Sequence, residues 1–275
     1  MITFPNCKIN LGLNVLQKRS DGFHNIETIF YPVPLKDALE IVPVQNAQQL
    51  PSITMYGLPV KGEATDNLCI KAWQLLKKDF ADLPAVQIHL LKNIPMGAGL
   101  GGGSADGACM LQLLNNKFHL GLSAQQLISY ALQLGSDCPF FIINEPCYAT
   151  GRGEIMEHIS ISLSGYQLVL VNPSIHINTG WAFSQLIVND SLTETVSLQQ
   201  AILQPVETWK QNIVNAFEIP VFEKYPEIKT LKENMYHLGA AYAAMSGSGS
   251  TIFGLFKAGE TWTHGLPAHY TTLQL

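Results

Sequence analysis

The segment PMGAGLGGGSADGA, residues 95–108, places five glycines in the seven positions 97–103 and leads into a predicted helix over 104–116. The first N–H groups of a helix have no intrahelical partner and carry partial positive charge. A loop without side chains ahead of such a helix lets an anion come close to the backbone. We therefore expect this segment to bind a phosphate group.

Two known phosphate-binding loops and a plain turn are the alternatives. Gly97, Gly99 and Gly102 satisfy the GxGxxG pattern of dinucleotide-binding folds, which also expects an acidic residue about 20 positions later. Around position 122 the sequence reads HLGLSAQQ instead. A P-loop needs lysine and then serine or threonine after its last glycine, whereas the letters SA follow Gly103. A flexible turn is less favoured. A run of glycines costs conformational entropy on folding, and ahead of a helix it usually allows the backbone to come close to a ligand.

The composition is that of a globular chain. Of its 275 residues, 47% are hydrophobic and 13% are charged, which excludes a disordered protein. The net charge is −5 and the 16 lysines and arginines are scattered, so we expect no nucleic-acid partner. No apolar run approaches the roughly 18 residues of a membrane span, so we expect no membrane association. Five widely spaced cysteines without a CxxC pair favour reduced thiols and a cytoplasmic location.

Strand and helix patterns are mixed without strict alternation, which favours an α+β fold. Residues 9–15 alternate apolar and polar side chains and predict a strand with one buried and one polar face. Lys8 and Asn10 then point the same way. Further strands are expected at 37–43, 52–57, 86–92 and 166–172, and a hairpin at 240–256 around the loop SGSGS.

Helical patterns complete the interpretation of the chain. They are expected at 66–82, 104–116, 123–135, 181–188, 206–218 and 226–239. The helix at 123–135 opens with a capping-box pair, Ser123 and Gln126. A shift in pattern near residues 152–164 predicts two domains, 1–156 and 157–275.

Four further blocks carry a resemblance to a known family. They are PNCKINLGLNVLQKRSDGFH (5–24), DNLCIKA (66–72), GSDCPFF (135–141) and SGSGSTIFG (246–254). With the glycine loop they resemble the GHMP kinases, named for galactokinase, homoserine kinase, mevalonate kinase and phosphomevalonate kinase. The resemblance implies a two-domain α+β GHMP kinase fold with the active site in the interdomain cleft. It also implies transfer of the γ-phosphoryl group of ATP to an alcohol, and the blocks look like the branch whose acceptor bears a cytidine diphosphate.

Two residues are candidates for the chemical step. From the sequence alone, Asp137 is a loop aspartate or a helix cap and Lys8 is a surface lysine. The family resemblance implies instead that Asp137 accepts the proton of the acceptor hydroxyl. Pro5, Lys8 and Asn10 match the pattern P-x-x-K-x-N, which implies that Lys8 lies beside this base and steadies charge on the oxygens. Asn10 is expected to bind the substrate or to hold the lysine.

The nucleotide is expected to bind at the glycine loop. The residues that the resemblance assigns to ATP are Pro95, Met96, Gly97, Gly99, Gly101, Gly102, Gly103 and Ser104. Asn67 resembles the residue that contacts the adenine, but as the first residue of a helix it has an equally good structural explanation. Mg²⁺ is expected to arrive with the nucleotide and to take few protein ligands.

The acceptor is expected to be recognised by aromatic side chains. The resemblance implies that Phe23 and Phe183 stack on the two faces of a cytosine while His24 hydrogen-bonds its edge. Tyrosine is frequent in the family at the position of Phe23, and the exchange keeps the stacking face but loses a hydroxyl. Thr179 is expected near the reacting hydroxyl.

The late glycine loop and the segment before it complete the expected acceptor site. The backbone at Gly247 and Ser248 is expected to approach the substrate. The segment IVNAFE (213–218) departs from an Asn-Asp-x-Glu pattern at Ala216, so its role stays open.

Three rival functions remain at this point. One is another GHMP kinase that acts on a small alcohol, against which Phe23, His24 and Phe183 argue. Another is an NAD-dependent oxidoreductase that uses the literal GxGxxG. The third is a nucleotide-binding regulator without turnover, against which Lys8 and Asp137 argue. A monomer and a homodimer are both open.

Overall fold

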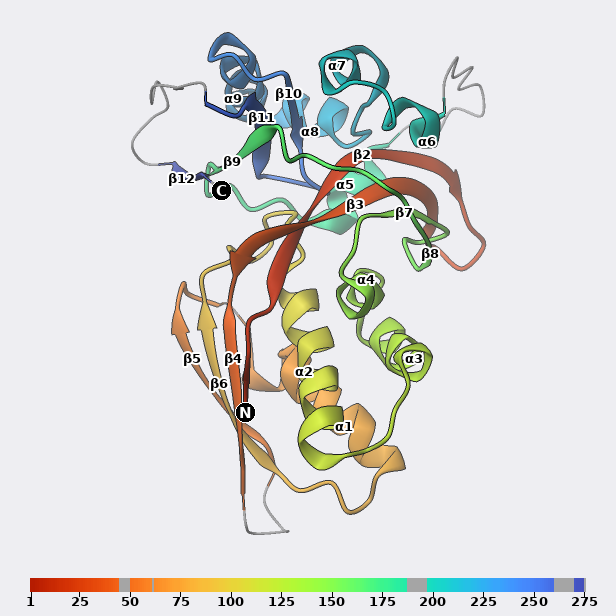
Figure 1. Ribbon diagram of the computed structural model, residues 1–275, viewed down its shortest axis with the longest axis vertical. Coiled ribbons are helices and arrows are strands. Elements are labelled where there is room, and N and C mark those ends of the chain that lie inside the picture. Colours follow the sequence, from red (N-terminus) through yellow and green to blue (C-terminus); the bar gives the residue numbers. More distant parts are fainter. Residues whose placement is uncertain (45–49, 61, 187–196, 260–269, 275) are drawn as a thin grey trace. The chain divides into compact units, whose positions relative to one another are not determined.

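The computed structural model describes residues 1–44, 50–60, 62–186, 197–259 and 270–274 (Figure 1). The chain forms two compact units that interleave along the sequence. Unit 1 consists of Met1–Lys8, Pro32–Met96 and Gly101–Asn144, and unit 2 of Ile9–Tyr31, Gly97–Leu100 and Glu145–Leu275. The predicted domains 1–156 and 157–275 assume a single boundary in the sequence, whereas each compact unit consists of three segments. These domain limits stay a prediction.

Unit 1 is a four-stranded sheet with helices packed beside it (Figure 1). Its strand order is β1 (Ile2–Thr3), β4 (Ala38–Pro43), β6 (Val86–Lys92) and β5 (Ser52–Gly57). Neighbouring strands are antiparallel except β5 and β6, which run parallel. The helical elements are η1 (Ala64–Asp66), α1 (Leu68–Asp79), α2 (Gly102–Phe118), α3 (Ala124–Leu134) and α4 (Cys138–Ile143). The predicted strands 37–43, 52–57 and 86–92 are confirmed to within one residue.

Side chains at the helix starts explain where the helices of unit 1 begin. The Ser123 hydroxyl accepts from the N–H of Gln126, and the Gln126 side chain accepts from the N–H of Ser123, so the predicted capping box of α3 is confirmed. Asn67 precedes α1 as its N-cap, and its Oδ1 accepts the Cys69 N–H at 2.9 Å. The prediction that Asn67 is the first residue of the helix is therefore wrong by one position, because its extended backbone lets the side chain fold back. Helix α2 begins at Gly102, two residues before the predicted start.

Unit 2 contains two further four-stranded sheets. One has the order β2 (Asn6–Lys18), β3 (His24–Lys36), β7 (Cys147–Thr150) and β8 (Ile155–His158), although the first residues of β2 and the last residues of β3 belong to unit 1. The other has the order β10 (Tyr242–Met245), β11 (Ile252–Lys257), β9 (Tyr166–Asn172) and β12 (Thr271–Gln274). The helical elements are α5 (Thr179–Ser184), α6 (Leu198–Ala201), η2 (Val206–Thr208), α7 (Trp209–Asn212), α8 (Glu218–Lys224) and α9 (Pro226–His237). The predicted strand 166–172 and the hairpin of β10 and β11 are confirmed.

The first long strand departs from its predicted exposure. In β2, every residue from Cys7 to Val15 is buried, so the alternation does not separate a core face from a solvent face. The polar side chains of this face are buried with hydrogen-bonding partners instead of water. The Asn10 amide donates to the Thr28 hydroxyl at 2.8 Å, and that of Asn14 donates to Glu27 at 2.8 Å.

The predicted helix 206–218 is broken in two. Ile213 is extended, with φ −120° and ψ 120°, and ends α7. The next residues pair with β2 instead, because Leu13 bonds to Val214 and Ala216 through its main-chain N–H and C=O. The tertiary contact thus overrides the local helix pattern. The predicted helix 181–188 is present as α5, which begins two residues earlier and ends at Ser184; residues 187 and 188 lie outside the described residues.

Among the described helices, none combines the length and the apolar character that a membrane crossing requires.

Candidate active site

Unit 1 brings Lys8 and Asp137 together. The ammonium nitrogen of Lys8 lies 3.3 Å from a carboxylate oxygen of Asp137. The Lys8 side chain is only 4% exposed, whereas that of Asp137 is 36% exposed and therefore accessible to a ligand. Asp137 occupies the N-cap position of α4 but makes no capping hydrogen bond with its side chain. Lys8 is therefore not a surface lysine, whereas Asp137 stands at the cap position without a side-chain capping bond. A buried cation faces a partly exposed carboxylate.

The glycine loop reaches this ion pair within the same unit. Gly101 has φ +71° and precedes α2, and a Cβ atom on it would lie 3.2 Å from Cε of Lys8 and 2.9 Å from the ring of Phe141. Only a residue without a side chain fits both this conformation and this space. Ser104, in the first turn of α2, hydrogen-bonds the thiol of Cys138, the residue after Asp137. The start of α2 and the Lys8–Asp137 pair are therefore neighbours.

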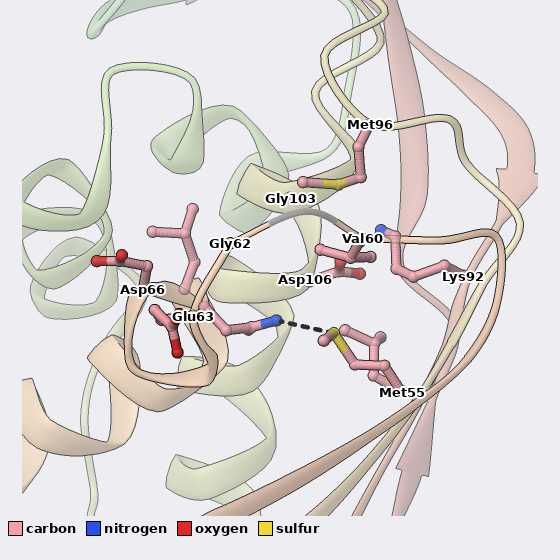
Figure 2. A pocket seen from close by; sticks show the side chains of 12 residues that line it. Met55, Val60, Gly62, Glu63, Asp66, Lys92, Met96, Gly103 and Asp106 are labelled. Atoms are coloured by element: carbon pink, nitrogen blue, oxygen red, sulfur yellow. Dashed lines mark hydrogen bonds and ion pairs between the residues drawn. The ribbon is translucent and has the colours of Figure 1, made fainter.

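A pocket of about 130 Å³ opens beside the same helix start (Figure 2). Asn67, Met96 and Gly103, three of the residues predicted to bind ATP, line it. While Oδ1 of Asn67 caps α1, its Nδ2 donates toward the sulfur of Met55 at 3.6 Å, which is the dashed line in Figure 2. The capping role and the position at the pocket are thus compatible. Pro95 precedes this loop, and a Cβ atom on Gly102 would lie 2.7 Å from Cγ2 of Ile94, so there is no room for a side chain there.

Two residues that line the pocket, Lys92 and Asp106, belong to a buried charge cluster that sequence reasoning missed (Figure 2). The Lys92 ammonium bonds both Asp37 and Asp106, and all three side chains are at most 4% exposed. Asp37 also accepts the backbone N–H groups of Asn93 and Ile94. Burial opposes the charge on Lys92, yet the two carboxylates raise its pKa. Asp106 lies within the glycine-loop segment, two residues after Ser104. A carboxylate at this place in the sequence is the signal that could have pointed to the cluster.

Asp106 is the member of the cluster whose carboxylate has an oxygen without a hydrogen bond: its Oδ1 has no partner among the described residues. Burial raises the pKa of Asp106 to about 7, with Asp37 raising it and Lys92 lowering it. The unfolded chain holds this carboxyl at its ordinary pKa of 3.8. The folded chain therefore binds more protons between these two values, and this group makes the unfolding free energy fall as pH rises through them.

We expect Asp106→Asn to remove this pH dependence. Relative to the unchanged protein, the variant should gain ~1 kcal/mol or more of unfolding free energy between about pH 5 and about pH 8, since each pKa unit corresponds to 1.36 kcal/mol. Urea unfolding at the two pH values measures the gain. Parallel pH profiles for the two proteins would show that Asp106 titrates like an exposed carboxyl.

Unit 2 gathers the remaining loop residues. The hydroxyls of Thr179 and Ser248 share a hydrogen bond of 2.9 Å. Ser246 donates its hydroxyl to the carbonyl of Gly99, and its Oγ accepts the N–H of Asn10 at 3.3 Å. A Cβ atom on Gly99 would collide with the Ser246 carbonyl, so this glycine is required. The structure thus joins the first four residues of the glycine loop, which include Gly97, to the late loop that carries Gly247.

The aromatic residues lie in a different arrangement from the predicted sandwich. The ring stacked on Phe183 is that of His24, with centroids 4.9 Å apart and planes inclined by 18°. Phe23 carries the guanidinium of Arg152 over its ring at 4.5 Å. Burial lowers the pKa of His24, and the neighbouring Lys18 lowers it further, so the ring is neutral near pH 7. Arg152 is a neighbour of this site that sequence reasoning did not identify.

The lysine–aspartate pair beside a glycine-rich helix start, on an α+β fold, defines a small-molecule kinase of the GHMP class. Residues 67–145 match the GHMP kinases N terminal domain and residues 199–261 match GHMP kinases C terminal. The chain is 52% identical over 263 residues to the 4-diphosphocytidyl-2-C-methyl-D-erythritol kinase of Bacteroides fragilis, across 96% of this chain and 94% of that relative. It belongs to the family of 4-diphosphocytidyl-2-C-methyl-D-erythritol kinases. The predicted family and α+β fold are therefore confirmed.

Solved structures agree with this assignment. A crystal structure of 4-(cytidine 5'-diphospho)-2C-methyl-D-erythritol kinase matches with a TM-score of 0.74 at 31% identity and covers 93% of this chain and 90% of its own. The phosphomevalonate kinase of Streptococcus pneumoniae, solved with phosphomevalonate and AMPPNP, matches with a TM-score of 0.67 at 15% identity, across 94% of this chain and 92% of its own. The second likeness concerns the fold alone.

Proposed function

We propose that Lys8 and Asp137 are the catalytic pair with which this protein transfers the γ-phosphoryl group of ATP to the 2-hydroxyl of 4-diphosphocytidyl-2-C-methyl-D-erythritol. The protein is an ATP-dependent small-molecule kinase of the nonmevalonate isoprenoid pathway, in line with the names of its relatives and its GHMP kinase domains. A family does not by itself assign roles to residues. The observation that carries the assignment is the 3.3 Å contact between Lys8 and Asp137 beside Gly101.

The reaction is an in-line displacement at the γ-phosphorus. The acceptor oxygen forms its bond to phosphorus while the bond to the oxygen that bridges the β and γ phosphates breaks, and ADP leaves. Asp137 takes the hydroxyl proton, because its carboxylate is partly exposed and has no capping bond to release. Lys8 stabilises the negative charge that develops on the transferred oxygens. The free N–H groups at the start of α2 hold the phosphates.

ATP binds across the start of α2, with its base in the pocket lined by Asn67, Met96 and Gly103. The size and position of this pocket beside the phosphate-binding loop support the proposal. A magnesium ion would be brought by the nucleotide, because this ion usually keeps several waters and is held by substrate phosphates with one or two protein oxygens. The hydroxyl of Ser104, in the first turn of α2, would be one such protein oxygen. The described part of the chain contains no group of three or more His, Cys, Asp or Glu side chains that could hold a metal ion.

The cytosine of the acceptor binds at Phe23, His24 and Phe183. Arg152 lies over one face of Phe23, and the residue is 49% exposed, which supports the stacking of a base on this ring. The neutral His24 ring offers one donor and one acceptor, which suits the mixed hydrogen-bonding edge of cytosine. Because His24 now stacks on Phe183, we expect it to turn aside when the base arrives.

The remaining proposals concern location and organisation. All five cysteines are free thiols, which supports a cytoplasmic location. Domain limits of 1–156 and 157–275 are retained as a proposal.

Removal of either phenylalanine ring tests the acceptor. We expect Phe183→Ala and Phe23→Ala to weaken acceptor binding roughly five- to 150-fold, since stacking contributes about 1 to 3 kcal/mol per base. Phe23→Tyr should be nearly neutral, and ATP affinity should stay within about twofold in all three variants. Calorimetric titration measures both ligands. Unchanged acceptor affinity in both alanine variants would disprove the cytidine assignment and redirect the search to smaller alcohols.

A further inference from the structure

The side chain of Asn215 is bonded to the strand end and loop that carry Gly247 and Ser248. Its Nδ2 donates to the carbonyl of Met245 at 2.7 Å and to that of Gly247 at 2.8 Å, while its Oδ1 accepts the N–H of Phe217 at 2.9 Å. Asn215 is only 2% exposed. Both donors of one amide are therefore used on main-chain carbonyls two residues apart at the start of the SGSGS loop, residues 246–250.

Glu218 holds the same strand end from the other direction. Its Oε1 accepts the N–H of Met245 at 2.9 Å, and its Oε2 pairs with Lys232 of α9 at 2.6 Å. Asn215 and Glu218 thus bind the carbonyl and the N–H of one residue, Met245. Because both side chains are buried, water is not a ready substitute for these bonds.

The segment 213–218 also forms main-chain hydrogen bonds with β2, the strand that carries Asn10. Leu13 of β2 donates to the carbonyl of Val214 at 2.9 Å and accepts the N–H of Ala216 at 2.8 Å. Ala216 makes this contact with its backbone, so alanine in place of aspartate leaves it intact. The segment therefore ties β2, which carries Asn10, to the SGSGS loop.

We propose that Asn215 and Glu218 are positioning residues that hold the SGSGS loop in the conformation that receives the acceptor. The loop carries Ser248, which already pairs with Thr179, and Gly247, whose φ of +55° is a conformation that the Asn215 bond stabilises. The inference rests on the proposed function, because it assigns this loop to the acceptor and not to ATP. An amide is required here, since aspartate would set a carboxylate against two carbonyl oxygens.

Hydrogen exchange and kinetics on Asn215→Ala test the inference, with Asn212→Ala as the matched control. Asn212 is an exposed residue whose side-chain amide donates to the carbonyl of Thr208 at 3.0 Å. In Asn215→Ala, amide exchange in a peptide spanning 243–252 should accelerate about tenfold or more while peptides from α9 keep their rates. The KM for the acceptor should rise about fivefold or more with the ATP dissociation constant within about twofold.

Three results for Asn215→Ala would overturn the inference: unchanged exchange in the loop, faster exchange throughout the chain, or equal weakening of ATP and acceptor binding. If Asn215→Ala does not fold, Glu218→Ala, which removes the acceptor of the Met245 N–H, must still accelerate loop exchange, and failure to do so overturns the inference. Failure of the proposed function is separate, because it appears as absent turnover in the unchanged protein.

Discussion

Replacing Asp137 with asparagine is expected to lower turnover about a hundredfold or more while the dissociation constant for ATP stays within about twofold. Asparagine keeps the size of the side chain but cannot take the proton of the acceptor hydroxyl. It also leaves the Lys8 ammonium, whose side chain is 4% exposed, without the carboxylate 3.3 Å away. Steady-state kinetics and calorimetry on the same preparation measure the two quantities.

The control for this variant is Asp82→Asn, which changes an exposed carboxylate after α1. It should leave turnover within about twofold, as is usual for a surface change. A folded Asp137→Asn protein with the turnover of the parent would remove this aspartate from the mechanism. Equal loss of ATP binding and turnover would show that the residue supports the loop and not the chemistry.

Valine in place of Gly102 is expected to weaken ATP binding at least about tenfold while the acceptor still binds. A Cβ atom at this position would lie 2.7 Å from Cγ2 of Ile94 and 3.5 Å from the ammonium of Lys92. Ile94 is fully buried, so the helix start must move, and the N–H groups proposed to bind the phosphates move with it. Titration of each ligand by calorimetry measures the effect.

Gly165→Val is the matched control for this second variant. A Cβ atom on Gly165 meets nothing within 4 Å, so both affinities should match those of the parent. Loss of both ligands in Gly102→Val would indicate general misfolding, and retention of full ATP affinity would show that the start of α2 does not hold the phosphates.

Local patterns in the sequence were enough for several elements of the fold. β4, β5, β6 and β9 coincide with short apolar runs bounded by glycine, proline or asparagine, because these residues end strands. The start of α3 was predictable since Ser123 and Gln126 satisfy each other within one turn. Such signals need no knowledge of distant residues.

Contacts between distant residues could not be predicted in the same way. Lys92 and Asp37 are 55 positions apart, and charged residues of these types usually lie at the surface, yet the two form a buried ion pair. The break between α7 and α8 arises from the pairing of Leu13 with the chain at Val214 and Ala216, which overrides a local helix pattern. The proposed catalytic pair came from the family resemblance, and only the structure shows that Asp137, at the N-cap position of α4, makes no capping hydrogen bond with its side chain.

The most direct measurement is phosphorus NMR of the product that the unchanged protein forms from ATP and 4-diphosphocytidyl-2-C-methyl-D-erythritol. We expect a new phosphomonoester on the 2-oxygen of the acceptor in an amount equal to the ADP released, and none when mevalonate or homoserine is the acceptor. Release of ADP without that phosphomonoester, or faster phosphorylation of either small alcohol, would contradict the assignment.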